Sequence, residues 1–565
     1  MDEFAQITLV ERGPDVSFAN CGLPYHIGGE IADRERLAIQ TPASLRSLLG
    51  IDVRALTEAT HIDRESRTVT VVDRTSGQVS QLPYDRLILA PGAAPLRPPL
   101  PGIDRPDILT LRSLEDMDRV KHKVESVSSV LVIGAGFIGL EMAEQLVHLG
   151  KTVHVVELQP QVLPALDPDM ALPLAHELVR HGIQLRLGTA VVAFEPGSRS
   201  DAPVCAITSQ GERLEVGAVI LSIGVVPESR LAKEAGLALT PRGHIAVNSY
   251  LQTSDPLIYA VGDVCATPDL FTGELTNVPL GGPANRQGRT CADHIVLGDR
   301  ALPYPGSLGT AIVRVFGQTA GVTGLSEKRL RALGRTYQTT LVAGSSHASY
   351  YPGAESVTLK LLWDADSGDV LGAQAYGGAG VDKRLDILAT ALRGRLTIDD
   401  LVHLELSYAP PFGSAKDVVN LAGFAASNQR DGLVRPIAAL PVEPQTQIID
   451  VRGAAASHEL PVPGARNIPL ATLREAVATL AREDDAFFSE SFLLARPLLQ
   501  AIEAARASMG GRGPRRDPQE DDDEDLSSSD ESSDETSDSE TDSEHDDDGG
   551  PPDDDDDDGG GGGGG

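Results

Sequence analysis

The sequence of 565 residues has few of the features that tie a protein together covalently or anchor it in a bilayer. Its cysteines number only four, and their spacing matches neither a zinc ribbon nor a disulfide framework, so each is treated as a lone thiol in a reducing compartment. No apolar run approaches the ~18 to 20 residues that span a bilayer, and Met1 is followed by two acids rather than by a signal region. These absences argue against a disulfide scaffold and a membrane protein, and they predict a cytoplasmic location.

Basic residues are absent from the C-terminal end. Residues 517–565 hold 24 of the 82 acids and no Lys or Arg, so the rest of the chain has 58 acids against 48 bases and a net charge of only −10. After Gly510 the composition is reduced to Asp, Glu, Ser and Gly, which cannot bury enough apolar area to offset the entropy of ordering. Residues 510–565 are therefore predicted to be a disordered acidic tail, which either only keeps the protein in solution or binds basic partners. No nucleic-acid or membrane partner is expected.

Apolar runs and glycine turns organise the remainder. Strand-like runs alternate with helical patterns through about residue 300, which is typical of α/β units on parallel sheets. From about residue 310 the pattern alternates, as in Thr310–Phe316 and Val357–Trp363, which predicts an antiparallel sheet with one covered face. The chain is thus expected to be mainly doubly wound, followed by a separate α+β domain.

A dinucleotide-binding turn is predicted after the buried strand Ser129–Ile133. The turn reads GAGFIG, and an Ala/Leu/Glu-rich helix follows to about His148. In such a turn Gly134 permits the tight bend, Gly136 lets backbone N–H groups reach a pyrophosphate, and Gly139 allows close helix packing, while the helix N-terminus supplies partial positive charge. The alternative is a purely structural glycine turn.

An acid ends the next strand of the same unit. Thr152–Val156 reads as a strand and is followed by Glu157, 18 residues beyond Gly139. A carboxylate there can accept hydrogen bonds from both ribose hydroxyls and repels a 2′-phosphate. The cofactor is therefore expected to be NADH, and NADPH is the less favoured choice.

A lone thiol lies in a glycine- and proline-containing segment near the start. The strand Ala5–Val10 ends in Glu11, and the segment SFANCGLPY follows from Ser17. Cys21 is expected at a helix N-terminus, where backbone donors stabilise the nucleophilic thiolate and Gly22 leaves the approach open. The alternative is a small buried hydrophobic residue, as free cysteines commonly are.

Several segments carry a family resemblance. Besides SFANCGLPY they are Tyr84–Pro95 (YDRLILAPGAAP), Leu221–Pro227 (LSIGVVP), Ile258–Val264 (IYAVGDV) and Pro283–Arg289 (PANRQGR). Together they resemble the coenzyme A disulfide reductases, a single-cysteine branch of the pyridine nucleotide-disulfide oxidoreductases, over about residues 2–430. The resemblance implies two interleaved Rossmann-like domains and an α+β dimerisation domain. The implied boundaries are 1–120 and 241–305 for FAD binding, 121–240 for NAD(P) binding and 306–430 for dimerisation.

The resemblance also implies the site. Cys21 is the redox thiol, and Tyr350 and Tyr408, in SYYPGA and LELSYAPPF, are hydrogen-bond donors to Cys21 of the other subunit of a homodimer. Asp263 hydrogen-bonds the ribityl chain of FAD. Either tyrosine is otherwise an ordinary packing residue, and Phe137 either gates the nicotinamide or packs in the core. The full cofactor set is Glu11, Gly92, Gly134, Gly136, Phe137, Gly139, Glu157, Gly224, Gly262 and Asp263, with Ser17 and Asn20 expected to bind substrate; no metal is expected.

One active-site sulfur leaves three functions open. Because no internal disulfide can store two electrons, oxidised Cys21 is either a mixed disulfide with a small thiol or a sulfenic acid. The first predicts an FAD-dependent enzyme that passes hydride from NADH through flavin to Cys21 and reduces a small disulfide such as CoA disulfide. The second predicts an NADH oxidase or peroxidase. The third is an inactive remnant whose acidic tail recruits partners.

The sequence departs from the family at three places. The strand–GxGxxG–helix unit that cradles the FAD pyrophosphate, and carries basic residues for CoA phosphates, is absent before Glu11, so either the start codon is misassigned or flavin binds weakly. Residues 445–475 resemble the first third of a rhodanese domain but lack its cysteine, and 486–509 reads as an unrelated amphipathic helix. His26 replaces the usual Tyr and either tunes the thiolate or is simply packed.

Overall fold

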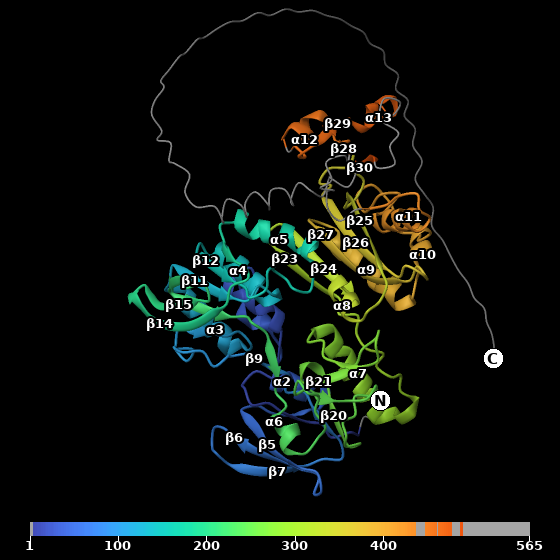
Figure 1. Ribbon diagram of the computed structural model, residues 1–565. Helices are drawn as coiled ribbons and strands as arrows, with labels where there is room; N and C mark the ends of the chain where they lie inside the picture. Colours follow the sequence, from blue (N-terminus) through green and yellow to red (C-terminus); the bar gives the residue numbers. More distant parts are fainter. Residues whose placement is uncertain (1–3, 437–446, 460, 477–485, 490–565) are drawn as a thin grey trace, which may run out of the picture. The chain divides into compact units, whose positions relative to one another are not determined.

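The computed structural model describes residues 4–436, 447–459, 461–476 and 486–489 (Figure 1). The chain divides into two units, 1–509 and 510–565, and the predicted acidic tail, which makes up the second, lies outside the described residues. Within the described ranges, no helix has both the length and the apolar character needed to cross a bilayer.

A five-stranded parallel sheet forms the nucleotide-type part of the fold. Its strand order is β10 (Ile108–Leu109), β17 (Ala218–Leu221), β11 (Ser129–Ile133), β12 (Thr152–Val156) and β13 (Gln184–Arg186). The helices that pack with it are α3 (Leu114–Glu125), α4 (Phe137–His148) and α5 (Pro168–Arg180). β11, β12 and the end of α4 lie where the sequence predicts them. Because the chain leaves β11 for β12 on one side and returns through β17 on the other, the carboxyl ends of β11 and β17 form the switch point at which such sheets bind ligands.

A second α/β part is built from smaller sheets. Two parallel pairs are β1 (Thr8–Val10) with β4 (Asp52–Arg54) and β8 (Leu87–Leu89) with β20 (Ile258–Ala260). This part also contains an antiparallel meander of β5 (Thr57–Asp63), β6 (Thr68–Asp73) and β7 (Val79–Pro83). A second meander, beside the nucleotide sheet, consists of β14 (Val191–Arg199), β15 (Ala202–Thr208) and β16 (Arg213–Val216). The 17-residue helix α7 (Gly281–Leu297) covers the predicted Pro283–Arg289 segment and starts two residues earlier.

An antiparallel sheet follows, as the alternating pattern predicts. Its order is β23 (Ala311–Val315), β24 (Gln318–Gly324), β27 (Val370–Gly377), β26 (Ser356–Trp363) and β25 (Gln338–Ser345), drawn in yellow-green to yellow in Figure 1. The helices α9 (Val381–Gly394) and α11 (Val418–Arg430) bury Leu385, Leu388, Val419 and Ala422 against Leu359, Leu361 and Trp363 of β26. One face of the sheet is therefore a closed apolar core.

The C-terminal described segment contains a small parallel sheet. Its order is β29 (Ala465–Asn467), β28 (Gln447–Asp450) and β30 (Ala486–Ser489), with α12 (Ala454–Glu459) and α13 (Leu470–Ala476) between strands. The prediction of a helix over 486–509 is wrong for residues 486–489, because their backbone pairs in register with β28. The remaining residues of that predicted helix lie outside the described ones. Arg452 holds the pKa of Asp450 at about 2 through paired hydrogen bonds to its carboxylate.

A buried lysine joins the nucleotide sheet's helix α5 to the antiparallel sheet. Lys360, on β26, is 2% exposed, and its Nζ lies 2.8 Å from Asp169, 2.5 Å from Glu327 and 3.2 Å from Asp167. Gln374 completes the group by donating to Asp167 Oδ2 at 2.7 Å. Burial alone lowers the pKa of Lys360, but the three carboxylates outweigh it and raise the pKa overall. The ammonium is therefore charged at neutral pH and neutralises the acids.

Replacing this lysine is expected to destabilise the fold. Lys360→Met leaves three acids around an apolar group, which costs about 3 kcal/mol or more of unfolding free energy for a broken buried pair. Because the pKa of Lys360 is raised, its stabilisation is present below the ordinary lysine pKa and is lost only as pH rises beyond it, so the deficit persists from pH 6 to 9. Thermal unfolding of the variant against Lys328→Met, an exposed lysine on α8 (Glu327–Ala332), measures it. Equal thermal-unfolding midpoints for the two variants would contradict a stabilising role of Lys360 among its three carboxylates.

Candidate functional site

The glycine turn between β11 and α4 has the shape that a pyrophosphate requires. Gly134 has φ +99°, and a Cβ on Gly139 would lie 2.0 Å from the carbonyl oxygen of Gly134. At Gly136, the N-cap of α4, a Cβ would meet nothing within 4 Å, and no side chain caps the helix. The buried Oγ of Ser222, at the end of β17, has no hydrogen-bond partner in the described part of the chain. An open cradle of main-chain donors is thus left beside an unpartnered hydroxyl, which fits a dinucleotide.

Glu157 lies beside this turn and is already engaged by the main chain. Its side chain is 8% exposed, Oε2 accepts from the Ala135 N–H at 2.7 Å, and Oε1 accepts from the Gln159 N–H at 2.7 Å. Each carboxylate oxygen has a second lone pair for a ribose hydroxyl. The carboxylate therefore holds the glycine turn in place and keeps acceptor capacity for a ligand.

The residues assigned to FAD lie on turns that follow strands. Gly262 has φ +76° in the 3₁₀ turn Gly262–Val264 directly after β20, and Gln287 of α7 accepts from its N–H at 2.7 Å. Asp263 in that turn is half-buried, and burial raises the pKa of its carboxyl despite the charge of Arg112. Gly92 (φ +72°) occupies an open turn where a Cβ would touch nothing, and so does Gly224 (φ +110°), which belongs to the expected NAD(P)-binding domain rather than to the FAD domain. These features fit a ligand that approaches the backbone closely.

Glu11 and Ser17 lie at strand ends in the N-terminal segment. Glu11 follows β1, and its Oε1 accepts from the Gly13 N–H at 2.6 Å. Ser17 begins β2 (Ser17–Phe18), which pairs with β3 (Ala38–Gln40). Both side chains are partly exposed, and both flank the segment that carries the thiol.

Cys21 is the one exposed thiol of the four, all of which lie in the described residues. It sits in the 3₁₀ turn Asn20–Gly22 just before α1 (Leu23–Gly28), so the predicted position at a helix start is confirmed and the buried alternative is wrong. Its backbone N–H and its Sγ both point to Asn20 Oδ1, at 3.0 and 3.6 Å. The expected lowering of the thiol pKa is not found: desolvation by the surrounding protein, with the charges of Glu141 and Asp263, raises it. The N-terminus of the six-residue helix α1 therefore does not lower the pKa of the thiol enough to offset desolvation and the two acids.

The sequence analysis missed Glu141 and Tyr25. Glu141 lies on the second turn of α4, and the Tyr25 hydroxyl of α1 donates to its Oε1 at 3.4 Å. Burial raises the pKa of Glu141 to about 7, against the Tyr25 hydrogen bond and the Arg314 charge, and the pKa of Tyr25 rises to about 12 through burial and Glu141. Both line a cavity of about 550 Å³ with Arg314, Thr319 and Asp382. No local pattern in the sequence could have found this pair, because the two residues lie 116 positions apart and meet only through a tertiary contact.

The two predicted tyrosines of the antiparallel-sheet part come together. Tyr350 and Tyr408 are 73% and 51% exposed, and their hydroxyls are 3.1 Å apart although 58 residues separate them. The hydrogen bond between the two hydroxyls raises the pKa of Tyr350. Either tyrosine alone could have been an ordinary packing residue. An exposed pair whose hydroxyls hydrogen-bond each other is not.

Two further predicted positions are packed rather than open. His26 is 4% exposed; its Nδ1 lies 2.7 Å from the carbonyl oxygen of Ile31, and its Nε2 lies 3.0 Å from Lys121 Nζ, so the packed alternative holds. Phe137 is half-buried at the start of α4 against the apolar core.

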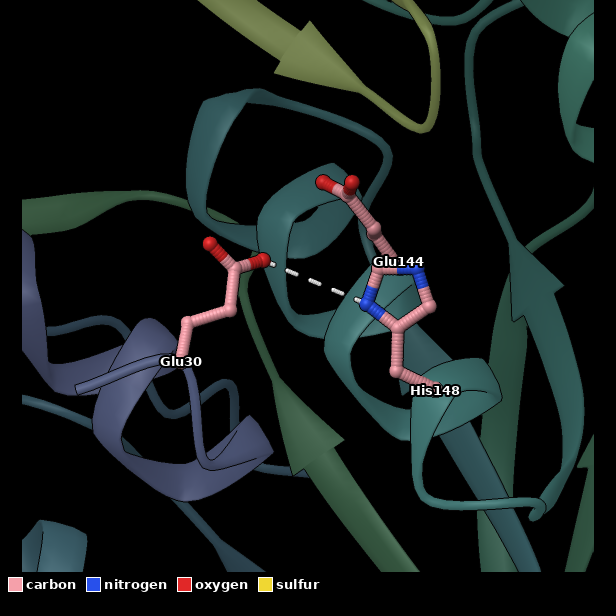
Figure 2. Close-up of side chains that lie close together, drawn as sticks. All are labelled: Glu30, Glu144 and His148. Carbon is pink, nitrogen blue, oxygen red and sulfur yellow. Dashed lines mark ion pairs between the residues drawn. The ribbon is translucent and has the colours of Figure 1, made fainter. Parts of the chain in front are cut away.

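A cluster with the composition of a metal site lies one turn further along α4. Figure 2 shows Glu30, Glu144 and His148 converging, with His148 Nδ1 4.0 Å from Glu30 Oε1. The guanidinium of Arg314 enters the same cluster, 2.6 Å from Glu30 and 3.6 Å from Glu144. A second acidic cluster in the described part, around Asp167, holds Lys360. In both a protein cation already supplies the positive charge that a metal would bring.

The chain is similar to characterised proteins over most of its length. The family model "Pyridine nucleotide-disulphide oxidoreductase" matches residues 3–282, and the dimerisation domain of the same name matches 310–418. Coenzyme A disulfide reductase of Staphylococcus aureus (strain bovine RF122 / ET3-1) is 33% identical over 429 residues, covering 75% of this chain and 95% of that protein. Reduced CoADR-RHD of Bacillus anthracis is 41% identical with a TM-score of 0.83, covering 88% of this chain and 91% of that one. An NAD-dependent persulfide reductase of A. fulgidus is 36% identical with a TM-score of 0.82, covering 88% and 93%. The chain belongs to the pyridine nucleotide-disulphide oxidoreductases and carries their dimerisation domain.

Proposed function

We propose that this oxidoreductase uses NADH and FAD to reduce a small disulfide of the coenzyme A type at Cys21. The observation that carries the proposal is that Cys21 alone among the four thiols is exposed, and that the charges acting on it come from α4, which starts at the glycine turn, and from the turn that bears Asp263. The thiol thus lies within electrostatic reach of both cofactor-binding elements. The coenzyme A disulfide reductase relative supports the choice of substrate.

Each cofactor has a proposed place among these residues. Gly134, Gly136 and Gly139 with Glu157 would hold the dinucleotide, which would supply hydride, and bound FAD would supply the two electrons for sulfur. Asp263 bonds the ribityl chain and Gly92 lets the ligand approach the backbone. We assign FAD binding to residues 1–120 and 241–305, NAD binding to 121–240 and dimerisation to 306–430. A thiol-based reaction fits a reducing cytoplasm.

A single sulfur fixes the order of events at the thiol. The Cys21 thiolate attacks one sulfur of the substrate disulfide; a Cys21–S–S–R bond forms, the substrate S–S bond breaks, and R–S⁻ leaves. Two electrons and one proton then cleave the mixed disulfide and release the second thiol. Asn20, whose amide oxygen now faces the Cys21 thiol, offers its NH₂ group to the thiolate after rotation of the amide.

Removing the thiol tests this function. Cys21→Ser is expected to abolish disulfide-dependent NADH oxidation, because a hydroxyl forms no mixed disulfide. Flavin absorbance and NADH binding should be unchanged. Absorbance at the NADH and flavin bands, with CoA disulfide as oxidant, measures all three, and Cys205→Ala, a buried cysteine on β15, is the control that retains turnover.

The same assay separates the alternatives. Retained disulfide turnover in Cys21→Ser rejects Cys21 as the nucleophile. NADH consumption by the unaltered protein with oxygen alone, and none with disulfide, makes it an oxidase instead.

The tyrosine pair allows a second test, of the homodimer. We propose that Tyr350 and Tyr408 donate hydrogen bonds to the sulfur atoms that react at the thiol of the partner subunit. The double variant Tyr350→Phe/Tyr408→Phe is expected to lower kcat by about a hundredfold, at the low end for general acids. In mixed dimers of this variant with Cys21→Ser, one site has both defects and the other has none.

Mixed dimers therefore distinguish partner-supplied from same-chain tyrosines. Two differently tagged chains, co-expressed and purified through both tags, should regain about half the activity of the unaltered dimer per dimer. If the tyrosines serve the thiol of their own chain, every site carries one defect and no activity returns.

A further inference from the structure

Helix α4 carries two carboxylates one turn apart, and only one of them is held by the main chain. Burial raises the pKa of both Glu141 and Glu144 to about 7. Glu144 is 1% exposed, and its Oε1 accepts from the Phe316 N–H at 2.9 Å, which ties α4 to the β23–β24 hairpin. In the described residues no main-chain N–H donates to Glu141, whose hydrogen bond is the one from Tyr25. Glu141 is therefore turned toward the segment that bears the thiol.

The ionisable and charged groups around Glu141 come from several parts of the fold. Tyr25 approaches from α1, Arg314 from β23, and Asp382 from α9 across the cavity; Cys21 lies in the turn before α1. The guanidinium of Arg314 is committed elsewhere, because it bonds Glu30 at 2.6 Å and lies over the Tyr25 ring at 5.6 Å. Among the described residues no ion pair reaches Glu141. A carboxyl without a paired cation holds its proton more readily than one in a salt bridge.

We propose that Glu141 is the proton-holding group of the thiol site, and that it passes its proton through the Tyr25 hydroxyl to the thiolate released when Cys21 attacks a disulfide. This assignment rests on the proposed function of Cys21 and adds the source of a proton to it. Glu141 acts through Tyr25, so it is a positioning and proton-storing residue rather than one that touches the substrate.

The proton step balances without a further reagent. Attack by the Cys21 thiolate releases R–S⁻; the Tyr25 O–H gives its proton to that sulfur, and the Glu141 carboxyl restores the phenol proton, so that R–SH and a Glu141 carboxylate result. The 3.4 Å contact between Tyr25 and Glu141 then has the direction seen in the structure, with the phenol donating to the carboxylate. The cavity of about 550 Å³ that both residues line has room for water to return a proton to Glu141.

A charge-neutral variant makes the assignment testable at the thiol itself. In Glu141→Gln the negative charge that opposes the Cys21 thiolate above pH 7 is gone. The pH midpoint for alkylation of Cys21 by iodoacetamide, followed by mass spectrometry on the purified full chain, is expected to fall by about one pH unit. In Glu144→Gln, the matched control one turn away, the midpoint should stay at the unaltered value, because Glu144 is not among the charges that shift Cys21.

Turnover supplies the second readout. The unaltered enzyme should lose kcat as pH rises through about 7, while Glu141→Gln should be slower by about tenfold or more and lack that limb. Tyr25→Phe should keep the alkylation midpoint, since Glu141 retains its charge, but slow turnover like Glu141→Gln. A purely structural Glu141 leaves the alkylation midpoint of Glu141→Gln where it was, and that result overturns the inference. Failure of the proposed function is a different result, disulfide turnover that survives Cys21→Ser.

Discussion

The close approach of helix α4 to the end of β11 is the constraint on which the rest of the site depends. A Cβ at Gly139 would lie 2.0 Å from the Gly134 carbonyl oxygen, so only glycine lets the helix sit there. With α4 in this position its N-terminus lies at the glycine turn, Glu141 reaches Tyr25 beside the thiol segment, and Glu144 reaches the Phe316 N–H of the antiparallel sheet. One helix therefore links the glycine turn, the thiol segment and the hairpin of the dimerisation domain.

Local patterns in the sequence predicted the elements with strong periodicity. They did not predict which distant segments contact each other. The strands Ser129–Ile133 and Thr152–Val156 and the end of α4 at His148 agree with the structure, because a buried apolar run and a glycine turn decide them locally. The sequence left Cys21 either at a helix start or buried as a small hydrophobic residue, and its exposed position just before α1 decides for the first. The strand at 486–489 was misread as helix, because its pairing with β28, 39 residues earlier in the chain, is not encoded in the segment itself.

The electrostatics of the thiol could not be predicted from the segment around it. Glu141 and Asp263 lie far from Cys21 in sequence, and the helix start that was expected to stabilise the thiolate is outweighed by these acids and by desolvation. Likewise, the cation nearest the acids of α4 comes from Arg314, and its contacts with Glu30, Glu144 and the Tyr25 ring join residues up to 289 positions apart. Charges that meet only through tertiary contacts leave little trace in the local sequence.

The raised pKa of the Cys21 thiol bears on why this family joins its subunits. A nucleophilic sulfur needs its thiolate, and within one chain burial and two carboxylates oppose it; the Asn20 Oδ1 accepts from the thiol, so only a short helix is on the other side. Under the proposed function, hydrogen-bond donors of the partner subunit would favour the thiolate. The exposed Tyr350 and Tyr408 hydroxyls present such donors on a surface of the dimerisation domain, and each dimer would then hold two thiol sites that neither subunit completes alone. A proton kept on Glu141 acts in the same direction, since a neutral carboxyl removes one of the two charges that disfavour the thiolate.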